Sequence, residues 1–137
     1  MALLDLTIQS SIEELQTIAD RVDDVADAKG WSQKTVFALQ VSLDEWISNV
    51  IKYSYKNAPN RPIRVKIEEK AGSVVAQVED EGAPFDPSSS QIPNSLDETL
   101  SGKREGGMGL FVMRHLLRDI AYQQANGRNI VTLRISM

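Results

Sequence analysis

The spacing of apolar residues along the chain changes several times, and each change marks a predicted element. Residues 2–9 form a short apolar stretch that predicts a strand. Apolar residues then recur at helical spacing through 12–26, so this segment is predicted to be a helix with one apolar face. Ser10 and Ser11 are expected to cap its N-terminus, and Gly30 its C-terminus.

A second, longer helix is predicted to begin at Ser32, which is a suitable N-cap, and its apolar stripe fades near Tyr55. Two strands are expected after it, at 63–69 and 74–78, because apolar residues alternate there with polar ones. Ala71-Gly72 lies between them and predicts a tight hairpin.

The character of the chain changes between Asp86 and Glu105, which contain two prolines, a serine triplet and mostly polar residues. A loop of this length is uncommon inside a compact domain and is typical either of a lid over a binding site or of a disordered segment. A helix at 108–118 and strands at 120–124 and 130–136 are predicted to follow. This order of elements predicts an α+β fold with helices on one face of a mixed sheet.

Composition narrows the class of protein. The 137 residues are those of one domain, so 1–137 is expected to fold as a single unit. The chain has no cysteine, no apolar run near the roughly 20 residues of a membrane span, and no signal-peptide pattern. A cytoplasmic protein is therefore expected. The net charge of −4 argues against direct nucleic-acid binding, which usually needs a basic surplus.

Three groups of residues carry candidate chemistry, and the first lies in the second predicted helix. Glu45 and Asn49 are four residues apart and share one helical face, which Lys52 and Tyr53 continue. Such a row is most often a solvated face. The functional alternative is that Asn49 offers an oxygen to magnesium, which takes few protein ligands, while Glu45 deprotonates a nucleophile.

The second group lies at the end of the strand at 74–78, where Asp80 is followed by Gly82 and then Phe85. One interpretation is a plain acidic turn. The functional alternative is purine recognition, because an aspartate accepts a hydrogen bond from the adenine amino group but would repel the guanine carbonyl. Gly82 would let the backbone approach the base closely.

The third group opens the last predicted helix with the sequence Gly106-Gly107-Met108-Gly109-Leu110. Free N–H groups at a helix N-terminus bind anions, and glycines let phosphates approach them. The pattern is not a Walker loop, because no lysine follows the glycines. A flexible helix start is the alternative interpretation.

Taken together, the three groups resemble the GHKL ATPase superfamily, which includes the catalytic domains of histidine kinases. Residues 44–55 (DEWISNVIKYSY) resemble its N box, 80–87 (DEGAPFDP) its first glycine box, and 106–122 its second. The resemblance is nearest to the small anti-sigma regulatory factors, which are serine/threonine protein kinases. It implies a two-layer α/β sandwich of the Bergerat type, with a mixed, mostly antiparallel sheet and an ATP lid at about 86–105.

The resemblance also implies roles for individual residues. Glu45 would be the catalytic base, Asn49 the magnesium ligand and Asp80 the adenine contact, with Gly82 shaping that turn. The family often has histidine where this chain has Tyr53. The nucleotide-binding set that follows from the three boxes is Asn49, Lys52, Tyr53, Asp80, Gly82, Phe85, Arg104, Gly106, Gly107, Met108, Gly109 and Leu110.

Two functions remain open on the sequence alone. The first is a protein kinase that transfers the γ-phosphoryl group of ATP, with magnesium, to a small antagonist (anti-anti-sigma) protein. Its binding to this antagonist would compete with binding to a sigma factor or an equivalent regulator. The second is an ATP-dependent module that sequesters its partner without phosphorylating it. Family resemblance also makes a homodimer an expectation.

Overall fold

The computed structural model describes residues 2–85 and 107–137, with the backbone alone at 107–111. The predicted order of elements is confirmed in these segments. The elements are β1 (Leu4–Gln9), α1 (Glu14–Lys29), α2 (Gln33–Asn49), a short π-helix η1 (Val50–Ser54), β2 (Pro62–Lys70), β3 (Ser73–Asp80), α4 (Gly107–Leu116), β4 (Asp119–Ala125) and β5 (Arg128–Ser136).

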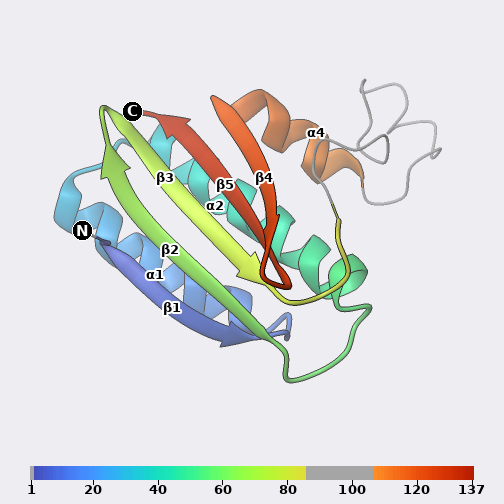
Figure 1. Ribbon diagram of the computed structural model, residues 1–137. Coiled ribbons are helices and arrows are strands. Elements are labelled where there is room, and N and C mark those ends of the chain that lie inside the picture. Colours follow the sequence, from blue (N-terminus) through green and yellow to red (C-terminus); the bar gives the residue numbers. More distant parts are fainter. Residues whose placement is uncertain (1, 86–106) are drawn as a thin grey trace.

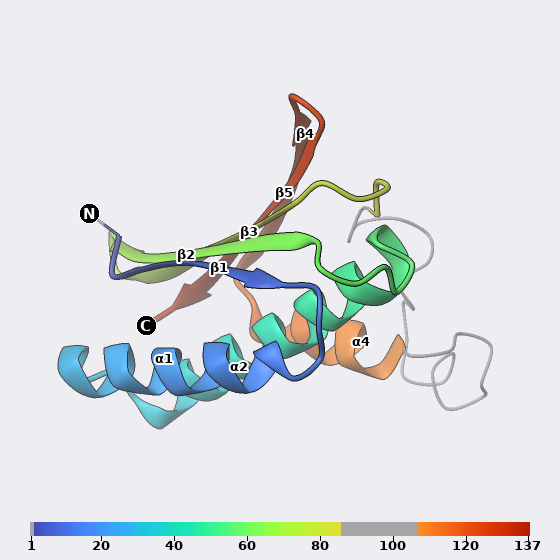
Figure 2. The same cartoon turned by 90° about the horizontal axis from the view of Figure 1, so that it is seen from below.

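The five strands form one sheet in the order β1-β2-β3-β5-β4, and the three α-helices cover one of its faces (Figures 1 and 2). All four pairings of the described strands are antiparallel. The predicted α+β fold with a mostly antiparallel sheet is therefore confirmed, and only the expected parallel component of a mixed sheet is missing from the described strands. The tight turns at Ala71-Gly72 and Asn126-Gly127 explain two of these pairings. Both residues of each turn have positive φ, as a two-residue hairpin requires.

A single apolar core lies between the sheet and the helices. Every second residue of the strands points into it, as the alternation of buried and exposed residues along β2 and β5 shows. The largest fully buried side chains are Trp46, Leu39, Leu43, Ile47, Ile63, Ile67, Met113, Leu133, Val22, Val50 and Val65. Burying each of these stabilises the fold by roughly 1.5–3 kcal/mol before entropy is counted.

The helix ends were only partly predicted. Gly30 ends α1 in the left-handed conformation and Ser32 Oγ caps α2 by accepting from the Thr35 N–H at 3.2 Å, as expected. The caps expected at Ser10 and Ser11 are wrong, because α1 begins after Glu13 without a side-chain cap. Ser10 Oγ instead donates to the Ala58 carbonyl at 2.7 Å, which ties the end of β1 to the loop before β2.

The second helix widens after Asn49. The segment Val50–Ser54 is π-helical, and the Tyr55 N–H donates to the carbonyl of Val50, five residues earlier, at 2.9 Å. The apolar stripe predicted one continuous helix to this point, since a single wide turn hardly changes the hydrophobic spacing. Single π-turns of this kind are frequent at functional sites.

The cap of α2 leads to a stability prediction. Replacing Ser32→Ala removes the acceptor of the Thr35 N–H and should lower the free energy of unfolding by about 1 kcal/mol. Replacing Ser11→Ala, where the expected cap is missing, should change it by less than about 0.5 kcal/mol. Urea denaturation of the three proteins measures both values. Equal losses for the two variants would contradict the assignment of Ser32 as the cap.

Candidate functional site

The last turn of α2 brings Glu45 and Asn49 into direct contact. The Asn49 Nδ2 donates to Glu45 Oε2 at 2.9 Å and to the Glu45 carbonyl at 2.7 Å. Asn49 is only 3% exposed, and its Oδ1 accepts no hydrogen bond from the described residues. The contact holds both side chains on one helical face and leaves an amide oxygen available to a ligand.

The environment of Glu45 favours its protonated form more than water does. Burial raises the pKa of this carboxyl above its ordinary value, and the negative charge of Asp44 acts in the same direction. The hydrogen bond from Asn49 and the charge of Lys52 oppose this rise. A carboxylate with a raised pKa, held in place by a neighbour, is suited to accept a proton from a hydroxyl near neutral pH.

Asp80 ends β3 with its side chain on the buried side of the sheet, only 2% exposed. Its Oδ1 accepts from the Gly82 N–H at 2.8 Å and from Asn129 Nδ2 at 2.9 Å. Its Oδ2 accepts no hydrogen bond from the described part of the chain. Burial raises the pKa of Asp80, against the opposing effect of these two donors. One oxygen is therefore fixed by the protein, and the other is available as an acceptor.

Asn129, in β5, was missed by the sequence analysis. It lies directly opposite Asp80 in the pairing of β3 with β5. Its Nδ2 also donates to the Gly82 carbonyl at 2.9 Å, and its Oδ1 accepts from the Tyr122 hydroxyl at 2.9 Å. The only local signal was the preceding Asn-Gly turn, which indicates a hairpin but says nothing about the strand beside it. Asn129 thus holds Asp80 and the following turn together.

The turn after Asp80 is fastened to the π-helical end of α2. A Cβ added to Gly82 would lie 2.5 Å from the Ser54 carbonyl oxygen, so only glycine fits there. The Ala83 N–H donates to this same oxygen at 2.8 Å, and the Tyr55 hydroxyl accepts from the Glu81 N–H at 2.8 Å. The sequence analysis expected Gly82 to permit approach to a base, whereas the close approach seen is to the helix end.

Phe85 packs on the same part of α2. Its ring stacks on Trp46, with centroids 5.5 Å apart, and on Tyr53, with centroids 5.1 Å apart. Tyr53 and Lys52 are exposed, so both can reach a ligand beside the helix. These contacts place the first and second candidate groups next to each other, although Tyr53 and Phe85 are 32 positions apart in the chain.

The third candidate group is described in part. Gly107, Met108, Gly109 and Leu110 form the first turn of α4, as predicted, and α4 packs against α2. Arg104 and Gly106 lie outside the described residues, as does the expected lid at 86–105. Because α4 packs alongside α2, the backbone at the N-terminus of α4 lies near the C-terminal end of α2, where the first candidate group is found (Figure 2).

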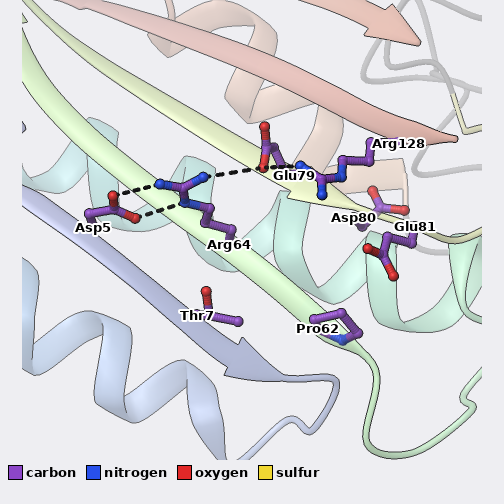
Figure 3. Close-up of a pocket in the computed structure, with 8 residues that line it drawn as sticks. All are labelled: Asp5, Thr7, Pro62, Arg64, Glu79, Asp80, Glu81 and Arg128. Atoms are coloured by element: carbon purple, nitrogen blue, oxygen red, sulfur yellow. Dashed lines mark hydrogen bonds and ion pairs between the residues drawn. The ribbon is translucent and has the colours of Figure 1, made fainter. Parts of the chain in front are cut away.

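A further cavity is lined mostly by side chains outside the candidate groups. It has a volume of about 480 Å³ and lies on the sheet face opposite the helices (Figure 3). Arg64 forms an ion pair with Asp5 at 2.8 Å and lies 4.0 Å from Glu79, which Arg128 approaches at the same distance. Asp80 is one of the lining residues of this cavity, whereas neither Glu45 nor Asn49 lines it.

Comparison with known proteins identifies the protein family to which the chain belongs. Over residues 8–135 the chain matches the family described as histidine kinase-like ATPase domain, and it belongs to that family. Membership implies that the chain uses ATP. No α-helix in the described residues is long and apolar enough to cross a membrane.

Curated relatives narrow the resemblance further. The chain is 29% identical over 103 residues to the serine/threonine-protein kinase BtrW of Bordetella bronchiseptica, covering 75% of this chain and 72% of that protein. It is 24% identical over 131 residues to the serine-protein kinase RsbW of Staphylococcus aureus, covering 93% and 82%. For RsbW of Bacillus subtilis the identity is 23% over 127 residues, covering 90% and 79%.

Solved structures support the fold. The structure of the RsbU and RsbW domains of Rv1364c from Mycobacterium tuberculosis superposes with a TM-score of 0.67 at 16% identity. The match covers 97% of this chain and 31% of the longer one. A histidine kinase domain from Erythrobacter litoralis gives a TM-score of 0.53 at 16% identity, covering 91% and 60%. These likenesses establish the two-layer α+β architecture.

The burial of Asp80 leads to a prediction about pH. Because its pKa is raised in the folded state, its contribution to stability is complete below the ordinary carboxyl pKa and is lost as pH rises through the raised pKa. Asp80→Asn carries no charge to bury, so at neutral pH it should unfold at higher urea concentration than the wild type. The same change should weaken binding of ADP, measured by calorimetry, because a neutral amide is a weaker acceptor.

Urea denaturation of wild type and Asp80→Asn across a pH series separates the cost of burying the Asp80 charge from a change in stability that does not depend on pH. The gap between them should widen as the pH rises, whereas Glu81→Gln, at an exposed neighbour, should follow the wild type. If the free energies of unfolding of wild type and Asp80→Asn differ by the same amount at every pH, burial of the Asp80 charge does not limit stability.

Asn129 leads to a second prediction. Asn129→Ala removes one donor from Asp80 and one from the Gly82 carbonyl, so it should weaken ADP binding by about tenfold or more. Gln124→Ala is a matched control, because Gln124 lies beside Asn129 on β4 but is exposed. Calorimetry with ADP measures both. An unchanged affinity in Asn129→Ala would mean that Asp80 needs no support from β5.

Proposed function

We propose that this protein is a serine/threonine kinase that transfers the γ-phosphoryl group of ATP to a hydroxyl of a small antagonist protein. The observation that carries the proposal is the Glu45–Asn49 pair, held at 2.9 Å at the end of α2 and joined through Ser54 to the Asp80 turn. A protein that only bound ATP would have no need of a carboxylate with a raised pKa at this place.

The names of the relatives support the same activity. BtrW is named a serine/threonine-protein kinase and RsbW a serine-protein kinase, and each aligns with most of this chain. The pair of Glu45 and Asn49 at the end of α2 supports this activity independently of these names.

Asp80 is proposed to select the base. Its free Oδ2 would accept a hydrogen bond from the adenine amino group, while a guanine carbonyl at the same place would face a carboxylate and repel it. The fixed Oδ1, held by Gly82 and Asn129, keeps Oδ2 in one orientation. Phe85, Tyr53 and Lys52 lie near the helix end where the rest of the nucleotide would extend.

The phosphates are proposed to lie between α2 and the first turn of α4. The backbone N–H groups of Gly107 and Gly109 at the start of α4 suit an anion. The free Oδ1 of Asn49 would hold magnesium, which would neutralise phosphate charge. The described residues contain no group of three histidine, cysteine or carboxylate side chains, which fits an ion held mainly by phosphates and water.

Glu45 is proposed as the general base. The acceptor hydroxyl oxygen forms a bond to the γ-phosphorus as the bond from that phosphorus to the bridging oxygen of ADP breaks. ADP leaves with the bonding electrons, and the hydroxyl proton passes to Glu45. Asn49 orients the carboxylate by donating to its Oε2. Arg104 and Gly106, which lie outside the described residues, are proposed to add contacts to the phosphates.

The proposed partners are an antagonist protein and a sigma factor or equivalent regulator, which would compete for this chain. Phosphorylation of the antagonist would weaken its binding and leave the chain free for the regulator. We also propose that the protein uses magnesium with ATP, forms a homodimer and is located in the cytoplasm.

The test compares two neighbouring variants. Glu45→Gln keeps the size of the side chain and an acceptor for Asn49, so ADP should bind within a few-fold of wild type. Phosphoryl transfer should fall about 100- to 10,000-fold, as expected for loss of a general base. Asn49→Ala should weaken binding of magnesium-ATP and transfer together. Labelled ATP, the cognate antagonist protein and calorimetry provide the measurements.

Asp27→Asn, at an exposed carboxylate of α1, is the control and should behave as wild type in both assays. If the wild type binds ATP and antagonist but transfers no phosphate, the chain is a sequestering module. If Glu45→Gln transfers phosphate at the wild-type rate, the kinase assignment holds and Glu45 is not its base.

A further inference from the structure

A groove runs between α1 and α2 and ends at the candidate base. Its volume is about 420 Å³, and Leu15, Ile18 and Ala19 of α1 face Val41, Asp44 and Glu45 of α2 across it. The two helices lie side by side under the sheet (Figure 2). The groove is separate from the charged cavity on the opposite sheet face, because the two have no lining residue in common.

Glu45 belongs both to this groove and to the site described above. Its carboxylate accepts from Asn49, and its side chain forms part of the groove wall. A hydroxyl brought along the groove would therefore meet Glu45 from the side that faces α1. This continuity is a property that a protein substrate requires, since its hydroxyl must reach the base while the nucleotide occupies the other side.

The groove is held open by a side chain that joins the two helices. The Nε2 of Gln40 donates to the Ala19 carbonyl at 3.1 Å and to Asp23 Oδ1 at 3.0 Å. These bonds fix the separation of α1 and α2 at this point. A ligand would find a preformed surface and would lose little free energy to ordering it.

The chemistry of the groove indicates the kind of segment that fits it. Leu15, Ala19 and Val41 are half-buried and offer an apolar floor. Asp44 and Asp23 on the border are exposed, and no described basic side chain forms an ion pair with either. The part of α1 nearer the groove adds to the negative charge, because Glu14, Asp20 and Asp24 outnumber Arg21.

We propose that this groove binds the segment of the protein substrate that carries the phosphorylated serine or threonine. An apolar side chain of that segment lies on the floor, and lysine or arginine residues beside it pair with Asp44 and Asp23. The proposal rests on the kinase function and adds to it the substrate-docking surface. Opposite charges across the border would speed association and align the hydroxyl with Glu45.

The test uses two pairs of variants and the recombinant cognate antagonist protein, with a non-hydrolysable ATP analogue present. Ala19→Arg fills the groove, while Thr17→Arg puts the same charge on the exposed opposite face of α1. Asp44→Lys reverses a border charge, while Asp27→Lys makes the same reversal far along α1. Calorimetry measures the affinity for the antagonist and, separately, for the nucleotide.

Ala19→Arg and Asp44→Lys should each weaken antagonist binding by about tenfold or more. The first change puts a cation on the apolar floor of the groove, and the second puts one beside the basic residues of the substrate. The Thr17 and Asp27 variants should stay within about twofold of wild type, and all four should bind nucleotide as wild type does. Wild-type affinity should also fall as salt rises, and less steeply in Asp44→Lys.

Antagonist binding that survives both groove variants, or that is absent from the wild type, would overturn the docking proposal. Binding that is lost only in the groove variants, with no phosphate transferred to the bound antagonist by wild type and ATP, would support the surface while refuting the kinase function. The two proposals therefore fail on different measurements.

Discussion

The contact between Gly82 and the carbonyl of Ser54 is the constraint on which the site depends. It brings the turn after β3 to the end of α2, where a side chain larger than hydrogen would meet the helix backbone at 2.5 Å. The π-turn at Val50–Ser54 presents this carbonyl to the Ala83 N–H. Through this contact the carboxylate of Asp80 and the pair of Glu45 and Asn49 belong to one site.

Both carboxylates of the candidate site lie in surroundings that disfavour their charged form. Burial raises the pKa of Asp80 and of Glu45, and in each case an asparagine donates a hydrogen bond that limits the rise. Asn129 has this role for Asp80 and Asn49 for Glu45. A neutral donor orients a carboxylate without adding the full charge of a lysine or arginine, so each acid retains an oxygen for a ligand or a proton.

The sheet has two different faces because the helices pack on only one of them. The helices cover one face of the antiparallel sheet, and the opposite face carries ion pairs around Arg64 and its neighbours. The site and the groove between α1 and α2 both lie on the helical side. Because Glu45 projects from α2 between them, a nucleotide and a protein could approach this residue from different directions.

The sequence alone determined the order of the elements, the hairpin turns, the cap at Ser32 and the three candidate groups. These depend on residues close together in the chain, whose periodicity and turn chemistry are local. Only the tertiary structure decided the pairing of Asn129 with Asp80, the contact of Gly82 with Ser54 and the all-antiparallel sheet. Each of these joins segments far apart in sequence, and no local pattern records which distant groups will meet when the core packs.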